Sequence, residues 1–349
     1  MKFALKLPHS NNVAAASAII QAAEAAEDLG FDAVSVHDHV QYDGGGIACG
    51  SIDPVPGGDV RNLYEPLLTL AFVASRTRRV RLQTAILLLP VREPILLAKQ
   101  TATLDALSGG RFVCGVAPGP PLKESRGETT RLATYQANAV KEYAAFRLKG
   151  NRGPMVDEYI RAMIAIWTQE QATFKGRHVS FENIDIFPKP VQKPHPPIWV
   201  GGRSERAIER VAELGNVWHP SQINPTQYAQ GLQVLRGKFA ARGRPLPVEY
   251  GVNIFSCIAA TDEEADRIAR PTLQGKFYNE QDYRTRTIVG SPETWIGLLK
   301  EWEAVGLTFC QIKPIYRTVA DLWPQLRLIA REVMPAFLEG PARPATAVS

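Results

Sequence analysis

The feature that most constrains the fold of this chain is a strict alternation of short apolar runs with amphipathic, helix-like segments. Strands are expected where such a run is bounded by Gly, Pro or Asn. Eight strands alternating with helices, with the first and last strands near the two ends of the chain, predict a (β/α)₈ TIM barrel with insertion segments, an α/β fold. The eight runs are Lys2–Leu7, Phe31–Val36, Val80–Leu89, Phe112–Ala117, Ile198–Val200, Asn216–Trp218, Val248–Ala259 and Thr308–Lys313.

An open doubly wound sheet is the alternative, and the turn after the first run argues against it. Such a sheet more often carries the glycine fingerprint G-x-G-x-x-G there. In this chain the turn reads Pro8-His9-Ser10-Asn11. We expect one barrel domain over residues 1–338, with a flexible C-terminal tail over 339–349. Four stretches interrupt the alternation and are expected to be insertions: residues 41–61, 118–153, 170–197 and 271–288, the third of them holding a small β-hairpin.

Composition excludes several classes of protein. The formal net charge is +5 in 349 residues and is not gathered into a basic tract, so nucleic-acid binding is not indicated. No apolar run approaches the ~20 residues of a membrane span, and the N-terminus reads as a strand and not as a signal peptide. The four cysteines are far apart in sequence, which favours buried thiols over disulfides or metal ligands. We therefore expect a cytoplasmic protein.

The turn after the fifth run is a candidate anion site. Gly201-Gly202 allows a sharp turn, Ser204 is a good helix N-cap, and Arg203 lies beside them. A helix N-terminus directs several backbone N–H groups at one point, which suits a phosphate. An ordinary strand-to-helix turn remains the alternative at this stage.

Histidines follow several of the predicted strands. His9, the stretch His37-Asp38-His39 and His219 all fall at carboxyl ends, where the active site of a barrel lies. An imidazole next to a carboxylate suits proton transfer near neutral pH. A metal site is a rival interpretation. No further Asp, Glu or Lys falls at the ends of strands three to six to complete a set of ligands, so we expect no metal ion. Simple packing of these histidines at the barrel edge is the other alternative.

Six segments, in order, resemble the bacterial-luciferase-like superfamily of flavin-type barrels, which includes FMN-dependent monooxygenases and F420-dependent oxidoreductases. They are Gly30–His39, Arg79–Ile86, Leu89–Ala98, Thr103–Phe112 with Gly115–Gly119, Pro188–Gly202 and Ile288–Glu293. Each is weak alone, but the six occur in the right order, and the resemblance extends over nearly the whole chain, residues 1–337.

The resemblance implies roles for particular residues. Gly201, Gly202, Arg203 and Ser204 match the family's phosphate site and should hold the cofactor phosphate. Ala85 and Ile86 should lie beside the flavin ring, with a non-prolyl cis peptide between them. Asp38 and His39 match the Asp-His pair of F420-dependent members. We expect His39 to act as general acid or base and Asp38 to orient it, with Glu124 as a more remote candidate.

Two departures from the family pattern leave the substrate open. The stretch Ala117-Pro118-Gly119-Pro120-Pro121 replaces a glycine-rich sequence after the fourth strand, and Leu88 stands where some members have a polar residue.

Three functions follow from the resemblance. The first is hydride transfer between reduced F420 and a small organic substrate; the second is FMN-dependent monooxygenation with O₂; the third is a flavin-binding barrel without catalysis. The cofactor is thus F420 or FMN. The resemblance also implies a homodimer and allows for a separate flavin or F420 reductase as a partner, with no membrane or nucleic-acid partner.

Overall fold

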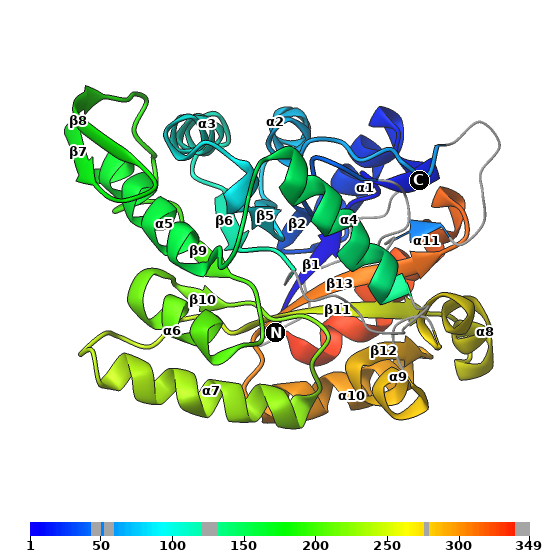
Figure 1. Cartoon of the computed structure of the whole chain (residues 1–349). Coiled ribbons are helices and arrows are strands. Elements are labelled where there is room, and N and C mark those ends of the chain that lie inside the picture. The colour runs from blue at the N-terminus through cyan, green and yellow to red at the C-terminus, as the bar shows by residue number, and fades with distance from the viewer. Residues whose placement is uncertain (43–49, 52–58, 121–130, 276–278, 339–349) are drawn as a thin grey trace.

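The structure is a computed structural model, and it describes residues 1–42, 50–51, 59–120, 131–275 and 279–338. A curled parallel sheet is surrounded by helices (Figure 1). In Figure 1, α2 (Pro66–Arg76) and α3 (Pro94–Leu107) lie along the upper edge, and α6 (Glu205–Leu214) and α7 (Pro225–Ala240) line the lower left. The hairpin of β7 (Gln171–Lys175) and β8 (Ser180–Asp185) projects at the upper left. The predicted TIM-barrel class is confirmed.

Strands pair in the order β10-β9-β6-β4-β2-β1-β13-β11-β12, and each of these pairings is parallel. The bounds are β1 Lys2–Lys6, β2 Ala33–Val36, β3 Gly50–Ser51, β4 Arg81–Thr84, β5 Leu87–Leu88, β6 Phe112–Ala117, β9 Ile198–Val200, β10 Val217–Trp218, β11 Gly251–Ile258, β12 Thr287–Gly290 and β13 Phe309–Tyr316. β3 pairs with β13 and β5 with β6. Sequential neighbours lie side by side, as the barrel order requires.

The barrel closes between the sixth and seventh predicted strands. An isolated parallel bridge joins Ser221, just after β10, to Asn253 of β11, and Asn253 N–H donates to the Pro220 carbonyl at 2.9 Å. Among the described strands, β12 pairs with β11 alone, along Phe255–Ile258 and therefore beyond the bridge at Asn253. The sequence pattern predicted an irregular loop with short helices over Pro271–Thr287. In the structure the helix that contains Pro271 continues to Leu273, a short helix follows at Glu280–Arg286, and the strand β12, which the pattern did not predict, begins at Thr287.

Helices connect the strands and cover the outside of the barrel. Their bounds are α1 Ala16–Asp28, α2 Pro66–Arg76, α3 Pro94–Leu107, α4 Arg131–Ala145, α5 Gly153–Thr168, α6 Glu205–Leu214, α7 Pro225–Ala240, α8 Asp262–Leu273, α9 Glu280–Arg286, α10 Pro292–Ala304 and α11 Leu322–Leu328. Short helical turns lie at Asn11–Val13, Leu89–Val91, Val319–Asp321, Ile329–Val333 and Met334–Phe337. Within the described residues, no helix is long and apolar enough to cross a bilayer.

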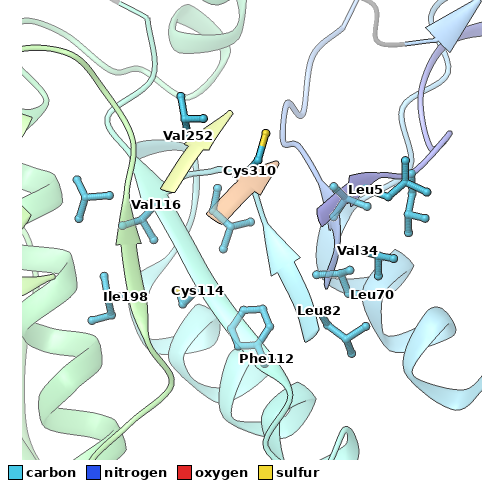
Figure 2. Packing of buried hydrophobic residues seen from close by; sticks show 14 of the residues in the cluster. Leu5, Val34, Leu70, Leu82, Phe112, Cys114, Val116, Ile198, Val252 and Cys310 are labelled. Carbon is cyan, nitrogen blue, oxygen red and sulfur yellow. The ribbon is translucent and has the colours of Figure 1, made fainter. Parts of the chain in front are cut away.

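The hydrophobic core lies between the strands and the helices. Side chains alternate in direction along a strand, so Leu5 and Val34 face outward, where Leu70 of α2 belongs to the same cluster (Figure 2). The residues one position earlier, Ala4 and Ala33, face inward and form a separate cluster inside the barrel with Val113, Trp199, Val217 and Phe309. One strand thus contributes to both an outer and an inner core.

Charged residues close the amino-terminal end of the barrel. Glu249 accepts hydrogen bonds from both terminal nitrogens of Arg81, at 2.8 and 3.0 Å, and from Lys2 at 2.5 Å. The Arg81 guanidinium lies 5.0 Å from the centre of the Phe309 ring. These contacts leave the carboxyl ends of the strands, which we call the barrel mouth, as the end open to a ligand.

Two of the predicted insertions hold elements that lie apart from the barrel sheet. β7 (Gln171–Lys175) and β8 (Ser180–Asp185) form a two-stranded antiparallel sheet apart from the barrel, so the predicted hairpin is confirmed. The 118–153 insertion carries α4. Most of the 41–61 insertion, the predicted tail and Glu124 lie outside the described residues.

Candidate active site at the barrel mouth

His9 and His37 form the inner part of the predicted histidine cluster. Their ring centres are 4.6 Å apart in an edge-to-face arrangement. Nδ1 of His9 lies 3.0 Å from the Leu7 carbonyl, and Nε2 accepts the His37 backbone N–H at 3.1 Å. Burial and the nearby Lys6 ammonium lower the pKa of His9 to about 3 and hold the pKa of His37 well below its usual value. Both rings are therefore neutral at pH 7.

His39 is placed by a carboxylate from a distant part of the chain. Its Nδ1 lies 2.9 Å from Oε2 of Glu142 in α4, and its ring stacks at 6.4 Å from the ring of Tyr42. The His39 and Glu142 side chains are 7% and 0% exposed. The expected orientation of His39 by Asp38 is thus corrected: the orienting carboxylate is Glu142.

Asp38 has a different set of partners. Its two carboxylate oxygens accept from Nη2 and Nε of Arg92, at 2.6 and 2.9 Å, and Oδ2 also accepts the Leu88 N–H at 3.0 Å. Arg92 in turn contacts Glu65, the N-cap of α2, at 2.7 Å, and the two carboxylates raise the pKa of the Arg92 guanidinium despite its burial. Asp38 consequently fixes the segment after β4 and does not orient His39.

That segment contains the predicted cis peptide. The bond between Ala85 and Ile86 is cis, as expected from the resemblance, and it separates β4 from β5. Thr84 just before it exchanges hydrogen bonds with the backbone of Gly115, at 2.9 and 3.0 Å. A Cβ on Gly115 would lie 1.9 Å from the Thr84 carbonyl oxygen, so only glycine fits there.

The turn after β9 reaches the same segment. A Cβ on Gly201 would lie 2.5 Å from Cδ1 of Ile86. Gly202 is exposed with φ +113°, a left-handed value that favours glycine. Ser204 Oγ accepts the Ala207 N–H at 3.2 Å and caps α6. The predicted turn and the predicted cis peptide are therefore in contact.

Arg203 lies on the solvent side of this turn. Its Nη1 donates to the Gln222 carbonyl at 2.9 Å, and the residue is exposed. Arg286, at the end of α9, reaches the same carbonyl at 3.4 Å. Two guanidinium groups thus converge on the Gln222 carbonyl, and one of them, that of Arg203, comes from the turn that leads into α6, whose N-terminal dipole favours an anion.

Polar side chains line the barrel interior above the inner apolar cluster. Nε2 of His219 lies 2.7 Å from Oε1 of Gln311, whose amide donates to Ser35 Oγ at 2.8 Å. Burial lowers the pKa of His219 to about 4. Gln83 of β4 is 1% exposed, and neither of its amide atoms has a partner among the described residues. Buried polar atoms are nearly always hydrogen bonded, so Gln83 is suited to a ligand or to water.

The described residues fit a cofactor with a flat polar ring and a phosphate. Gly201 removes the side chain that would otherwise press on Ile86, Gln83 offers a buried donor and acceptor, and the α6 N-terminus with Arg203 suits a phosphate. Within the residues that the structure describes, no group of three or more His, Cys, Asp or Glu side chains is arranged to hold a metal ion.

The proline-rich stretch that opens the 118–153 insertion is held by residues from later in the same insertion. Arg152 donates to the carbonyls of Pro118 and Pro120, at 3.2 and 2.7 Å, and its guanidinium lies 4.0 Å from the centre of the Tyr143 ring. Leu88 packs in a cluster with Val91, Ala139 and Tyr143. The two departures from the family pattern therefore meet under α4.

Fold and mouth together define an α/β-barrel enzyme whose mouth is lined by histidines and by the glycine-containing turn between β9 and α6. The sequence profile of the luciferase-like monooxygenase family matches residues 1–289. The chain belongs to this family, which places it among the flavin-dependent oxidoreductases.

Individual relatives differ in cofactor. An FMNH₂-dependent dimethylsulfone monooxygenase of Pseudomonas putida is 31% identical over 205 residues, which are 58% of this chain and 52% of that protein, so the chain spans about half the length of this relative. A monooxygenase from Streptomyces bottropensis has a similar structure, with a TM-score of 0.75 and 21% identity over 97% of this chain and 100% of that chain. The F420-dependent tetrahydromethanopterin reductase of Methanopyrus kandleri gives 0.72 and 17% over 97% and 99%. These structural similarities establish the fold.

Three residues of the mouth were not found from the sequence. Glu142 stands in a polar insertion with weak periodicity, Arg92 in the turn before α3, and Gln83 within the strand β4. A polar amide in the middle of a run predicted to be a buried strand was a usable signal for Gln83. For Glu142 the sequence carried none.

Proposed function

We propose that this protein is an oxidoreductase that transfers hydride between reduced F420 and a small organic substrate, with His39 as the group that exchanges the accompanying proton. The observation that carries the proposal is the His39–Glu142 contact at the end of β2. Reduction of a carbonyl requires one hydride at carbon and one proton at oxygen. An imidazole whose Nδ1 is held by a carboxylate can exchange that proton through Nε2.

When bound, the cofactor supplies the hydride. The chain supplies the surroundings: Gly201, Gly202, Arg203 and Ser204 would hold the phosphate, and Ala85 and Ile86 would lie beside the ring. Asp38 keeps the Ile86–Leu88 segment in place through the Leu88 N–H. His9 and His37, both neutral, line the inner side without adding charge.

The second candidate is FMN-dependent monooxygenation with O₂. It is favoured by the 31% identity to a monooxygenase described as FMNH₂-dependent. The phosphate turn suits FMN and F420 equally, because both carry a phosphate at the end of the ribityl chain. A cofactor-binding barrel without catalysis is the third candidate. A homodimer, a cytoplasmic location and a partner reductase complete the proposal.

The deciding experiment titrates the apoprotein with F420 and with FMN and then follows reoxidation of each reduced cofactor, with and without O₂, against a panel of ketones and aldehydes. Tight binding of F420 and anaerobic reoxidation by a carbonyl substrate would support the first candidate. Tight binding of FMN with O₂-dependent product would replace it by the second. Binding without turnover of any substrate would leave the third.

A further inference from the structure

Glu142 connects the 118–153 insertion to the end of β2. Its Oε2 lies 2.9 Å from His39 Nδ1, and its Oε1 accepts the backbone N–H groups of Val40, at 2.5 Å, and Gln41, at 3.2 Å. One carboxylate thus holds the His39 imidazole and the backbone of Val40 and Gln41, which lead into the 41–61 segment.

The burial of this carboxylate requires such contacts. The Glu142 side chain has no exposed surface, and a buried carboxylate is costly unless it is hydrogen bonded or paired. Within the described part of the chain, His39 is the only basic side chain within ion-pair distance of Glu142. An apolar residue would satisfy packing at this position, but it would leave the two N–H groups and the imidazole without their acceptor.

The position of Glu142 is fixed by the rest of α4. Ala139 and Tyr143, its helix neighbours, are fully buried in the cluster with Leu88 and Val91. Leu88 also gives its N–H to Asp38, the residue before His39. The carboxylate is therefore tied to the segment after the cis peptide as well as to His39.

We propose that Glu142 is the positioning residue of the site: it holds the proton of His39 on Nδ1, so that Nε2 is the nitrogen presented for proton exchange, and it fixes the start of the 41–61 segment in the same contact. The role in turnover depends on the proposed function of His39, whereas the contact itself does not. The insertion is then a working part of the active site.

The test compares Glu142→Gln and Glu142→Asp with the parent in the full-length, ¹⁵N-labelled protein. Ring ¹⁵N shifts of His39 report which nitrogen carries the proton, and hydrogen exchange reports protection of the Val40 and Gln41 amides. Asp105→Asn is the matched control, because Asp105 is a fully buried carboxylate that accepts the Gln192 backbone N–H and side-chain amide near the start of β6, away from the mouth.

In Glu142→Gln we expect His39 to lose its single Nδ1–H form. The Val40 and Gln41 amides should exchange about tenfold faster, which corresponds to a loss of 1.4 kcal/mol in the free energy that protects them from exchange. Glu142→Asp should recover part of both signals, and Asp105→Asn should alter neither. With the cofactor that binds, kcat should fall about 10- to 100-fold while cofactor affinity holds. Unchanged ring shifts and exchange in Glu142→Gln would overturn the proposal. Altered ring shifts with unchanged kcat would support the positioning and overturn the acid–base role of His39.

Discussion

Gly201 lies directly against Ile86: a Cβ at position 201 would come within 2.5 Å of the Ile86 Cδ1 atom. The two residues follow β9 and β4, which are separated in the sheet by β6. The turn after β9 and the cis peptide thus form one continuous surface at the barrel mouth. That surface depends on the absence of a side chain at a single position.

Gly201→Ala should weaken cofactor binding by about 1–3 kcal/mol through displacement of the Ile86 side chain. The fold should be kept, because the contact is with the end of a flexible side chain. Gly237→Ala is the control: a Cβ there meets nothing within 4 Å in the exposed part of α7, so it should leave binding intact and raise stability by about 0.4–1 kcal/mol. Cofactor titration and urea unfolding measure the two effects. Unchanged cofactor affinity in Gly201→Ala would show that Gly201 is not part of the surface that binds the cofactor.

His39→Ala should lower turnover about 100-fold or more and leave cofactor affinity largely intact, because the imidazole is assigned to proton exchange and not to holding the cofactor. His178→Ala, in the exposed β7–β8 hairpin, is the matched control and should behave as the parent. Steady-state rates with the bound cofactor provide the measurement. A His39→Ala variant that turns over at the parental rate would refute the assignment.

Asp38→Asn should reduce the free energy of unfolding by about 3–5 kcal/mol, because Arg92 would remain buried without its full counter-charge. Arg92→Leu should have a cost of the same order, and the double variant should cost less than the sum of the two. Asp59→Asn breaks an exposed ion pair with Arg61 and should have little effect. Urea unfolding at pH 7 distinguishes these cases, and additive losses would contradict the pairing.

Stability should fall as the pH decreases from 7 to 5. The pKa values of His9 and His219 are lowered to about 3 and about 4 by burial, so the unfolded chain takes up protons below about pH 6.5 that the folded protein does not. The free energy of unfolding is therefore highest above about pH 6.5, where both imidazoles are neutral in the folded and in the unfolded chain. It falls as the pH decreases toward the lowered pKa values of the folded protein, because only the unfolded chain then binds the protons. By pH 5 the loss is about 2 kcal/mol for each imidazole. Urea unfolding at both pH values tests this, and His219→Gln should show a smaller drop.

The exposed faces of α2 and α3 predict where a homodimer would form. These neighbouring helices expose Leu68 by 73%, Phe72 by 46% and Leu96 by 56%. Apolar side chains gathered on a surface commonly mark an interface. Leu68→Glu combined with Leu96→Glu should convert a dimer to a monomer in light scattering. Val248→Glu, at a 94% exposed position elsewhere, should not. A monomeric parent protein would refute the prediction.

Local pattern was sufficient for much of this molecule. The alternation of apolar runs with helical segments predicted the order of eight barrel strands, because a strand buried between helices and an inner core must be apolar and short. The resemblance placed the cis peptide at Ala85–Ile86. The local pattern was less complete after Leu273, where it predicted a loop with short helices and missed the short strand β12 that follows α9.

The histidine cluster shows where sequence alone reached its limit. Asp38 and His39 are adjacent, which made Asp38 the obvious partner, but successive side chains of an extended chain point to opposite sides. Asp38 therefore turns to Arg92 and His39 to Glu142, a carboxylate 103 residues away in an insertion with no motif of its own. Position in the sequence was sufficient to place Asp38 and His39 at the end of β2, whereas Glu142 and Arg92 joined them only in the folded protein. Which carboxylate holds which group depends on how α4 folds back over the strands, and no local pattern encodes that contact.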